Sequence, residues 1–165
     1  MRKLELNVGG LNINPKSLRS IDYLGTHNFI VKVERDKHSK LTDSFSIYVA
    51  DKRKDSGGLH CEYVMERFKI LKGVVAGGDL FVDENDNLVF YNGGGELHGG
   101  TPKALITRFG ELMIPKLKEK GINIKNIVPL DSHPDDNGDF GVEWDLSPFW
   151  INAGYFTTKP LVEFH

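Results

Sequence analysis

The stretch Leu88–Lys103, LVFYNGGGELHGGTPK, constrains the fold more than any other part of the chain. It joins an apolar strand pattern to five glycines within eight residues and then to a helix start. Thr101 is a typical N-cap residue, and Pro102 suits the first helical position. A strand that passes through glycines into a helix N-terminus can bind an anion, because unpaired backbone amides and the helix dipole point at the same place.

This glycine loop does not match a nucleotide-binding motif. It lacks the Gly-Lys-Ser/Thr ending of a P-loop, and His98 stands where GxGxxG requires its third glycine. The alternative is a tight surface loop without a ligand. The anion-binding interpretation predicts ligands among Gly93, Gly94, Gly95, His98, Gly99, Gly100, Thr101 and, at the rim, Lys103.

A second feature is a histidine at a predicted helix start. Apolar residues recur every three or four positions between Leu59 and Lys72, which predicts an amphipathic helix with Cys61 on its buried face. His60 then lies in the first turn, where the positive end of the helix dipole disfavours imidazolium. A neutral imidazole can act as a nucleophile or a general base. The alternative is a helix-start histidine with no chemical role.

The remaining pattern predicts an α+β fold. Short apolar or β-branched runs alternate with polar loops, and only two segments have clear helical periodicity. We expect residues 1–165 to form a single domain, with one mixed or largely antiparallel sheet and two main helices packed against it. The second helix is expected to kink or end before Pro115. Strands are expected near residues 4–8, 29–33, 45–49, 80–82, 88–91 and 122–128, and one helical turn near Pro15.

Composition narrows the class of partner and the compartment. The net charge is −2 and the pI is about 6.3, so neither nucleic acid nor an anionic membrane is an expected partner. Cys61 is the only cysteine, which excludes an intrachain disulfide and fits a reducing compartment. The sequence has no apolar run of membrane-spanning length and no signal-peptide core, so we expect a cytoplasmic protein.

The order of these features resembles the Janus/Ocnus family of phosphohistidine phosphatases over about residues 28–128. The resemblance is carried by His60 in LHCEYVMERF, by Val75–Gly78, by Val89–Tyr91 and by the glycine loop followed by Thr101–Ala104. It implies a metal-independent phosphatase or phosphate-binding protein without a cofactor. His60 would be catalytic, and amides from Cys61 and the Gly93–Gly100 loop would hold the phosphate. A phosphorylated protein or a small phosphorylated molecule would be the substrate.

The chain departs from the family at a position that matters for charge. The family carries a basic residue just after its glycines, and here that position is Asp79. Lys32 is a candidate for an earlier basic contact. These departures support an alternative function, a non-enzymatic protein-interaction module that uses the glycine loop and an aromatic C-terminal tail. The large aromatic residues of that tail are Trp144, Phe149, Trp150, Tyr155, Phe156 and Phe164.

No metal site is predicted. The acidic run Asp131–Asp139 does not follow the spacing of an EF-hand loop, and Asp83–Asn87 is better interpreted as a hairpin turn. The sequence does not predict an oligomeric state.

Overall fold

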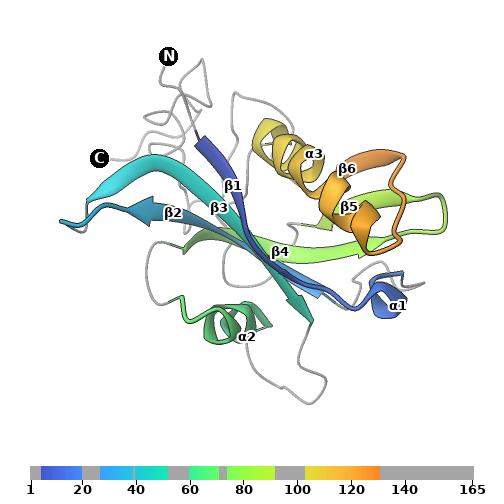
Figure 1. Cartoon of the computed structure of the whole chain (residues 1–165), viewed down its shortest axis with the longest axis horizontal. Helices are drawn as coiled ribbons and strands as arrows, with labels where there is room; N and C mark the ends of the chain where they lie inside the picture. Colours follow the sequence, from blue (N-terminus) through green and yellow to red (C-terminus); the bar gives the residue numbers. More distant parts are fainter. Residues whose placement is uncertain are drawn as a thin grey trace.

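A computed structural model describes residues 5–19, 27–38, 40–51, 60–70, 74–91 and 103–130. These residues form one six-stranded sheet with three helices (Figure 1), which confirms the α+β fold class. The strand order is β1-β3-β2-β4-β5-β6; the β1–β3 and β5–β6 pairs are parallel and the others antiparallel. The elements are β1 (Glu5–Asn12), α1 (Pro15–Leu18), β2 (His27–Arg35), β3 (Leu41–Asp51), α2 (His60–Arg67), β4 (Val74–Val82), β5 (Asn87–Tyr91), α3 (Lys103–Glu119) and β6 (Asn126–Leu130).

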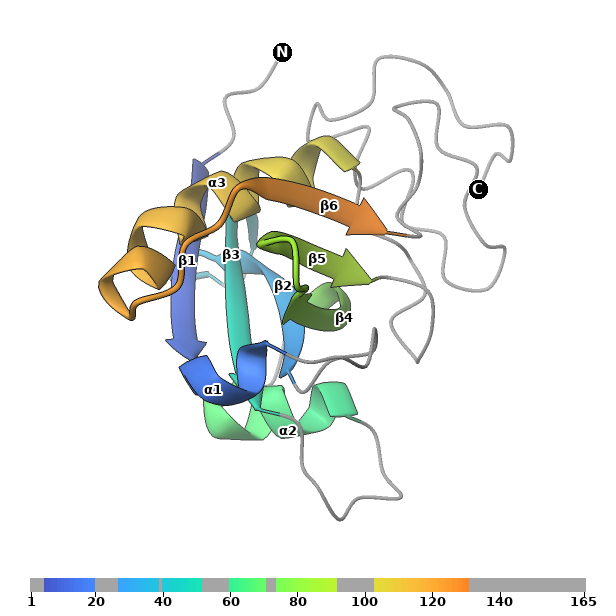
Figure 2. The same cartoon turned by 90° about the vertical axis from the view of Figure 1, so that its right-hand side faces the viewer.

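A different main helix packs against each face of the sheet. Side chains alternate along β2, so Phe29, Val31 and Val33 join one apolar cluster while Ile30 joins another. The larger cluster includes the inward face of α3, and the smaller one includes α2. The two main helices therefore lie on opposite faces of the sheet, as Figure 2 shows. Leu105, Ile106, Phe109, Met113 and Leu117 are the fully buried α3 residues of the larger cluster.

The sheet curls around α3. This helix packs against β1 and β6, which are the two edge strands. One helix can contact both edges only if the sheet bends toward it, and Figure 2 shows α3 running between β1 and β6. Burial of the α3 side chains inside this curve contributes about 1.5–3 kcal/mol for each large apolar side chain.

Glycines that the sequence pattern treats as breaks lie inside strands. Gly9 and Gly10 were expected to end the first strand, but β1 continues to Asn12, with a register shift between Val8 and Gly10. A Cβ atom at Gly9 would meet the Tyr48 ring, and one at Gly10 would meet the Phe68 ring. β4 likewise runs through Gly77 and Gly78. A Cβ atom at Gly78 would clash with the Tyr91 carbonyl oxygen. Gly9, Gly10 and Gly78 are therefore required by close packing rather than by a turn.

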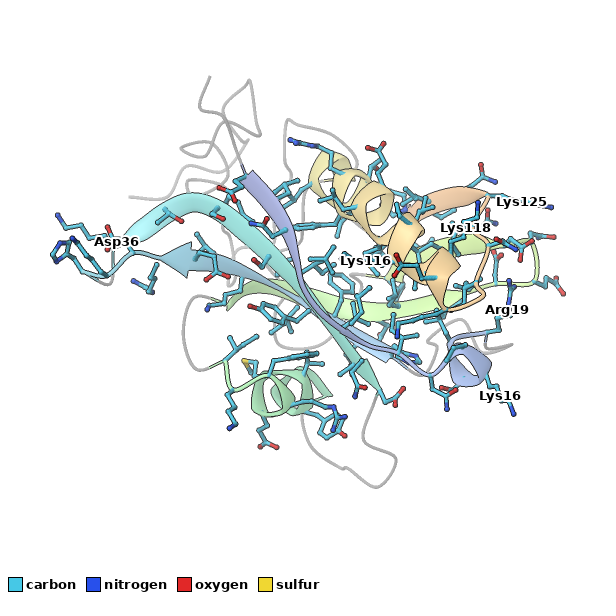
Figure 3. The ribbon with its side chains drawn as sticks, viewed as in Figure 1. Lys16, Arg19, Asp36, Lys116, Lys118 and Lys125 are labelled. Carbon is cyan, nitrogen blue, oxygen red and sulfur yellow. The ribbon has the colours of Figure 1, made fainter. Side chains whose placement is uncertain are left out.

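The two main helices also differ from their expected lengths. α3 continues through Pro115 to Glu119, so the expected end before Pro115 is wrong. α2 ends at Arg67, earlier than the periodicity predicts, because Lys69 adopts a left-handed conformation with φ 55°. The exposed Lys116 and Lys118 lie in the last turn of α3 (Figure 3), where cations favour the helix dipole. None of the helices in the described part of the chain is long and apolar enough to cross a membrane.

Candidate functional site

The position of α2, the helix that begins at His60, is set by packing against the sheet. Val64 and Ile70 are buried against Ile30 and Ala50, so the helix lies over β2 and β3. The Phe68 ring stacks at a tilt on Tyr48, with 5.2 Å between ring centroids. Burial, followed by the nearby Glu34 carboxylate, raises the pKa of Tyr48, and Lys32 opposes this. The neutral Tyr48 side chain is thus part of the sheet surface on which α2 packs.

A hydrogen bond from Arg67 anchors the C-terminal end of α2. With the Asn12 amide oriented so that its oxygen faces the helix, this oxygen accepts from Arg67 Nη2 at 2.7 Å and from Arg67 Nε. Asn12 is the last residue of β1 and pairs with Ala50 in β3. The helix is therefore tied to the edge strand at one end, while His60 begins its other end.

A row of polar residues crosses the sheet on the α2 face. Asn28 in β2 pairs with Asp79 in β4, and Asp79 pairs with Tyr91 in β5. Directly paired residues of antiparallel strands point to the same face, and these three share the face of Ile30, which packs under α2. Asp79 and Tyr91 are half-buried, whereas Asn28 is only 2% exposed. The polar row thus leads from the buried interior toward the surface.

The Asn28 amide fixes the Asp79 carboxylate in place. Its Nδ2 donates to Asp79 Oδ1 at 2.8 Å and to the Gly78 carbonyl oxygen at 3.1 Å. Both donor hydrogens are therefore used, and they define the orientation of the amide. The opposite atom, Asn28 Oδ1, is buried and accepts no hydrogen bond within the described residues. Such an unpaired buried acceptor costs about 1–3 kcal/mol, so it is an unusual feature of a folded chain.

The structure places the helix-start residues on opposite faces of the sheet. The backbone of His60 and Cys61 forms the beginning of α2, and Lys103 begins α3. Figure 2 shows both helices beginning on the side of the molecule toward which β5 points. The predicted ligands between Gly93 and Thr101 lie outside the described residues, as does the aromatic tail.

Lys32 is not close to the polar row along its strand. It lies four residues beyond Asn28, or about 13 Å at the usual rise of a strand. Its Nζ is 3.3 Å from the Glu34 carboxylate, which is 33% exposed. The cation nearest in sequence to the row is therefore directed to a neighbouring glutamate.

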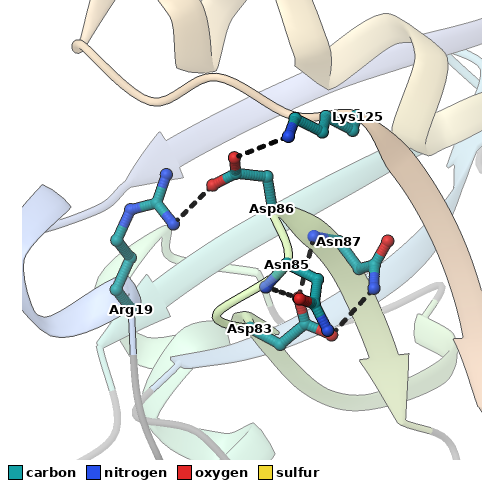
Figure 4. A network of polar contacts seen from close by, with 6 residues as sticks. All are labelled: Arg19, Asp83, Asn85, Asp86, Asn87 and Lys125. Atoms are coloured by element: carbon teal, nitrogen blue, oxygen red, sulfur yellow. Dashed lines mark hydrogen bonds and ion pairs between the residues drawn. The ribbon is translucent and has the colours of Figure 1, made fainter.

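The acidic Asp83–Asn87 segment forms the expected hairpin turn between β4 and β5 (Figure 4). Asp83 Oδ1 accepts from the backbone amides of Asn85 and Asn87 at 2.9 Å each, and Oδ2 accepts from Asn87 Nδ2 at 2.9 Å. Asp86, at φ 62°, pairs with Arg19 at 2.8 Å. The carboxylates thus stabilise the turn itself.

The described residues contain no group of three or more His, Cys, Asp or Glu side chains that could hold a metal ion. The polar row contains one carboxylate, one side-chain amide and one phenol, and the carboxylate of Asp79 is its charged member. A carboxylate at this place disfavours an anion.

A buried histidine lies on the other face of the sheet. His27 is fully buried, and its Nε2 lies 2.6 Å from Asp51 Oδ1 and 3.4 Å from the Asn14 backbone nitrogen. Nε2 accepts a hydrogen bond from the Asn14 backbone N–H, and the buried Asp51 Oδ1 has no hydrogen-bond partner among the described residues. This pair ties the start of β2 to the end of β3.

Sequence reasoning singled out Asp79 but missed Asn28. The available signal was that the polar Asn28 stands at the start of the apolar run NFIVKV. It lies two positions before the buried Ile30 and so on the same face of the strand. Local pattern could not show that Asn28 faces Asp79, since 51 positions separate them.

The comparisons match this chain with no protein family, no curated protein and no solved structure.

Proposed function

We propose that this chain is a non-enzymatic binding module whose site is the polar row Asn28–Asp79–Tyr91 beside α2. The observation that carries this proposal is the 2.8 Å hydrogen bond from Asn28 to Asp79. It holds a carboxylate on the helix-covered face, at the position where the resemblance to the phosphohistidine phosphatases calls for a cation.

The sign of this charge separates the two function classes. A phosphate oxygen about 4 Å from a carboxylate would be disfavoured by about 4 kcal/mol at the effective dielectric of a protein surface. Rotating Asp79 away would leave the Asn28 Nδ2 group without its carboxylate partner, at a cost typical of a lost charged hydrogen bond. The Asp79 carboxylate would therefore repel a phosphate bound beside this row. A protein partner without a negative charge at this place would not meet the same repulsion.

A metal-independent phosphatase is the second candidate, and one observation favours it. His60 begins α2, and the positive end of the helix dipole there would both favour a neutral imidazole and attract a phosphoryl group. In that candidate, His60 is the nucleophile or the base, and backbone amides from Cys61 onward hold the phosphoryl oxygens.

A hydrolysis assay separates the two candidates. The wild-type chain and the His60→Ala variant are incubated with p-nitrophenyl phosphate and with a phosphohistidine peptide, and release of phosphate is measured. The binding-module proposal predicts no turnover above the buffer rate for either protein. A matched Asp79→Asn variant controls for repulsion by the carboxylate.

The outcome that contradicts the proposal is specific. Turnover by the wild-type chain that falls at least a hundredfold in His60→Ala, with an unchanged melting temperature, would assign the phosphatase function. Turnover that appears only in Asp79→Asn would support the proposal, because it would show that the carboxylate keeps the phosphate out.

A further inference from the structure

We infer that the β2–β3 hairpin is an arm that docks on an acidic segment of a protein partner. Near its turn, this hairpin extends beyond the rest of the sheet. The pairing of β2 with β4 ends at Lys32, and the pairing of β3 with β1 begins at Ser44. Arg35 and Leu41 therefore form strand pairs only with each other among the described strands. Figure 1 shows the hairpin projecting past the other strands.

The tip of the arm carries an excess of positive charge. Residues 35–40 have the sequence RDKHSK, with three cations and one acid. The net charge of this segment is therefore +2 with histidine neutral, whereas the net charge of the whole chain is −2. Lys37 and Lys40 are exposed, and neither ammonium forms an ion pair with a described residue.

Internal hydrogen bonds hold the tip in one shape. The Asp36 amide donates to the Lys40 carbonyl oxygen at 2.9 Å, which closes the turn. Asp36 Oδ1 accepts from the backbone amides of His38 and Lys40 at 2.8 and 3.0 Å. The one acid of the tip is therefore directed to the backbone, while the lysine side chains face solvent. A turn that is ordered before binding loses less conformational entropy when a partner docks.

The base of the arm is fixed as well. Thr42 Oγ1 donates to the Glu34 carbonyl oxygen at 2.9 Å and accepts from the Ser44 amide at 3.2 Å. The Lys32 ammonium lies 3.3 Å from the Glu34 carboxylate, so the cation at the base has a nearby counter-ion. The arm thus presents its excess charge at the tip.

The charge of the rest of the chain favours a compact acidic segment over a long polyanion. At physiological ionic strength, exposed charges act over about 8 Å. A short acidic segment of a protein can contact the tip alone, where the charge is positive. A nucleic-acid duplex or an anionic membrane is larger and would also face the rest of a chain whose net charge is negative. Charge complementarity therefore selects a run of Asp and Glu side chains in a protein.

This surface is separate from the polar row. Asp36 lies eight residues beyond Asn28, or about 26 Å at the usual rise of a strand. The inference therefore goes beyond the proposed function, and the hydrolysis assay of His60→Ala does not test it.

Fluorescence anisotropy of a labelled acidic peptide tests the inference. The probe is a short peptide that alternates glutamate with glycine, and the control peptide carries glutamine in place of every glutamate. We expect saturable binding of the glutamate peptide to the full chain at low ionic strength, with an affinity that falls as salt is added. The glutamine peptide should bind at least tenfold more weakly.

Two double variants locate the binding. Lys37→Gln/Lys40→Gln removes two charges from the tip and keeps Asp36 and its bonds to the backbone. We expect an unchanged melting temperature and at least tenfold weaker binding of the glutamate peptide. Lys116→Gln/Lys118→Gln removes the same charge from exposed positions of α3, at the opposite end of the molecule (Figure 3), and should change binding less than twofold.

The inference is overturned if the two peptides bind equally, if the glutamate peptide does not bind at millimolar concentration, or if both double variants weaken its binding to the same extent. A single-stranded oligonucleotide and phosphatidylserine vesicles are titrated in parallel. Binding of either one that is tighter than that of the glutamate peptide, and is lost in the hairpin variant, would also overturn it.

Discussion

Several polar residues in the described part of the chain are held by short contacts, but two buried oxygens, Asn28 Oδ1 and Asp51 Oδ1, have no hydrogen-bond partner there. Asp83 organises the β4–β5 turn, and His27 joins β2 to β3. Asn28 alone combines nearly complete burial with an oxygen that no described residue satisfies.

Asp83 gives a prediction at this scale. Burial alone would raise the pKa of this carboxyl, but hydrogen bonds from Asn87 and Asn85, with help from Arg19, lower it overall. The resulting stabilisation is therefore complete above the unfolded-state pKa of about 3.9 and is lost as the pH falls through the lower folded-state value. Asp83→Asn should cost about 1–3 kcal/mol at pH 7, measured by urea unfolding.

The same experiment at low pH tests the cause. The stability difference between the wild type and Asp83→Asn should shrink as the pH falls below about 4, because the wild-type carboxyl then also loses its charge. Glu84→Gln, at the exposed neighbouring position, is the matched control and should change stability little at either pH. A difference that stayed constant from pH 7 to pH 2 would argue against the hydrogen-bonded carboxylate.

At the scale of elements, the contact between α3 and β6 depends on one small residue. Gly110 is buried, and a Cβ atom there would lie 2.8 Å from both Cδ1 and Cγ2 of Ile127. Glycine inside a helix usually costs about 1 kcal/mol relative to alanine. Here the close approach of the helix to the strand explains why alanine is absent.

Gly110→Ala should therefore have opposite effects in two backgrounds. In the wild type it should destabilise the fold by about 1–3 kcal/mol through overpacking against Ile127. In an Ile127→Ala background the space is open, and the same change should stabilise the fold by about 1 kcal/mol through helix propensity. Chemical denaturation of the four proteins measures the coupling, and additive effects would contradict the contact.

Elements were predictable from sequence where local periodicity sufficed. The helix that His60 begins, the acidic hairpin turn and the apolar strands β2 and β3 follow from side-chain spacing alone. The errors share a physical cause, since they concern residues whose effect depends on neighbours distant in sequence. Gly78 permits a neighbouring carbonyl to approach, and Pro115 stays within a helix that packing holds in place.

At the scale of the whole molecule, topology creates the candidate site. The strand order places β2 between β3 and β4, and thereby sets Asn28 against Asp79, while β5 adds Tyr91 to the same row. Sequence reasoning identified Asp79 as an obstacle to phosphate but could not identify its partner. The sheet curls toward α3 and leaves α2 on the opposite face, so the row beside α2 is separated from the main core.

The central claim is that the Asp79 carboxylate, held by Asn28, keeps phosphate away from this face of the sheet. Nuclear magnetic resonance of the ¹⁵N-labelled chain tests it most directly, by following the side-chain amide of Asn28 during a titration with inorganic phosphate. We predict no shift of this resonance in the wild-type chain. A saturable shift of the wild-type resonance with phosphate would contradict the account.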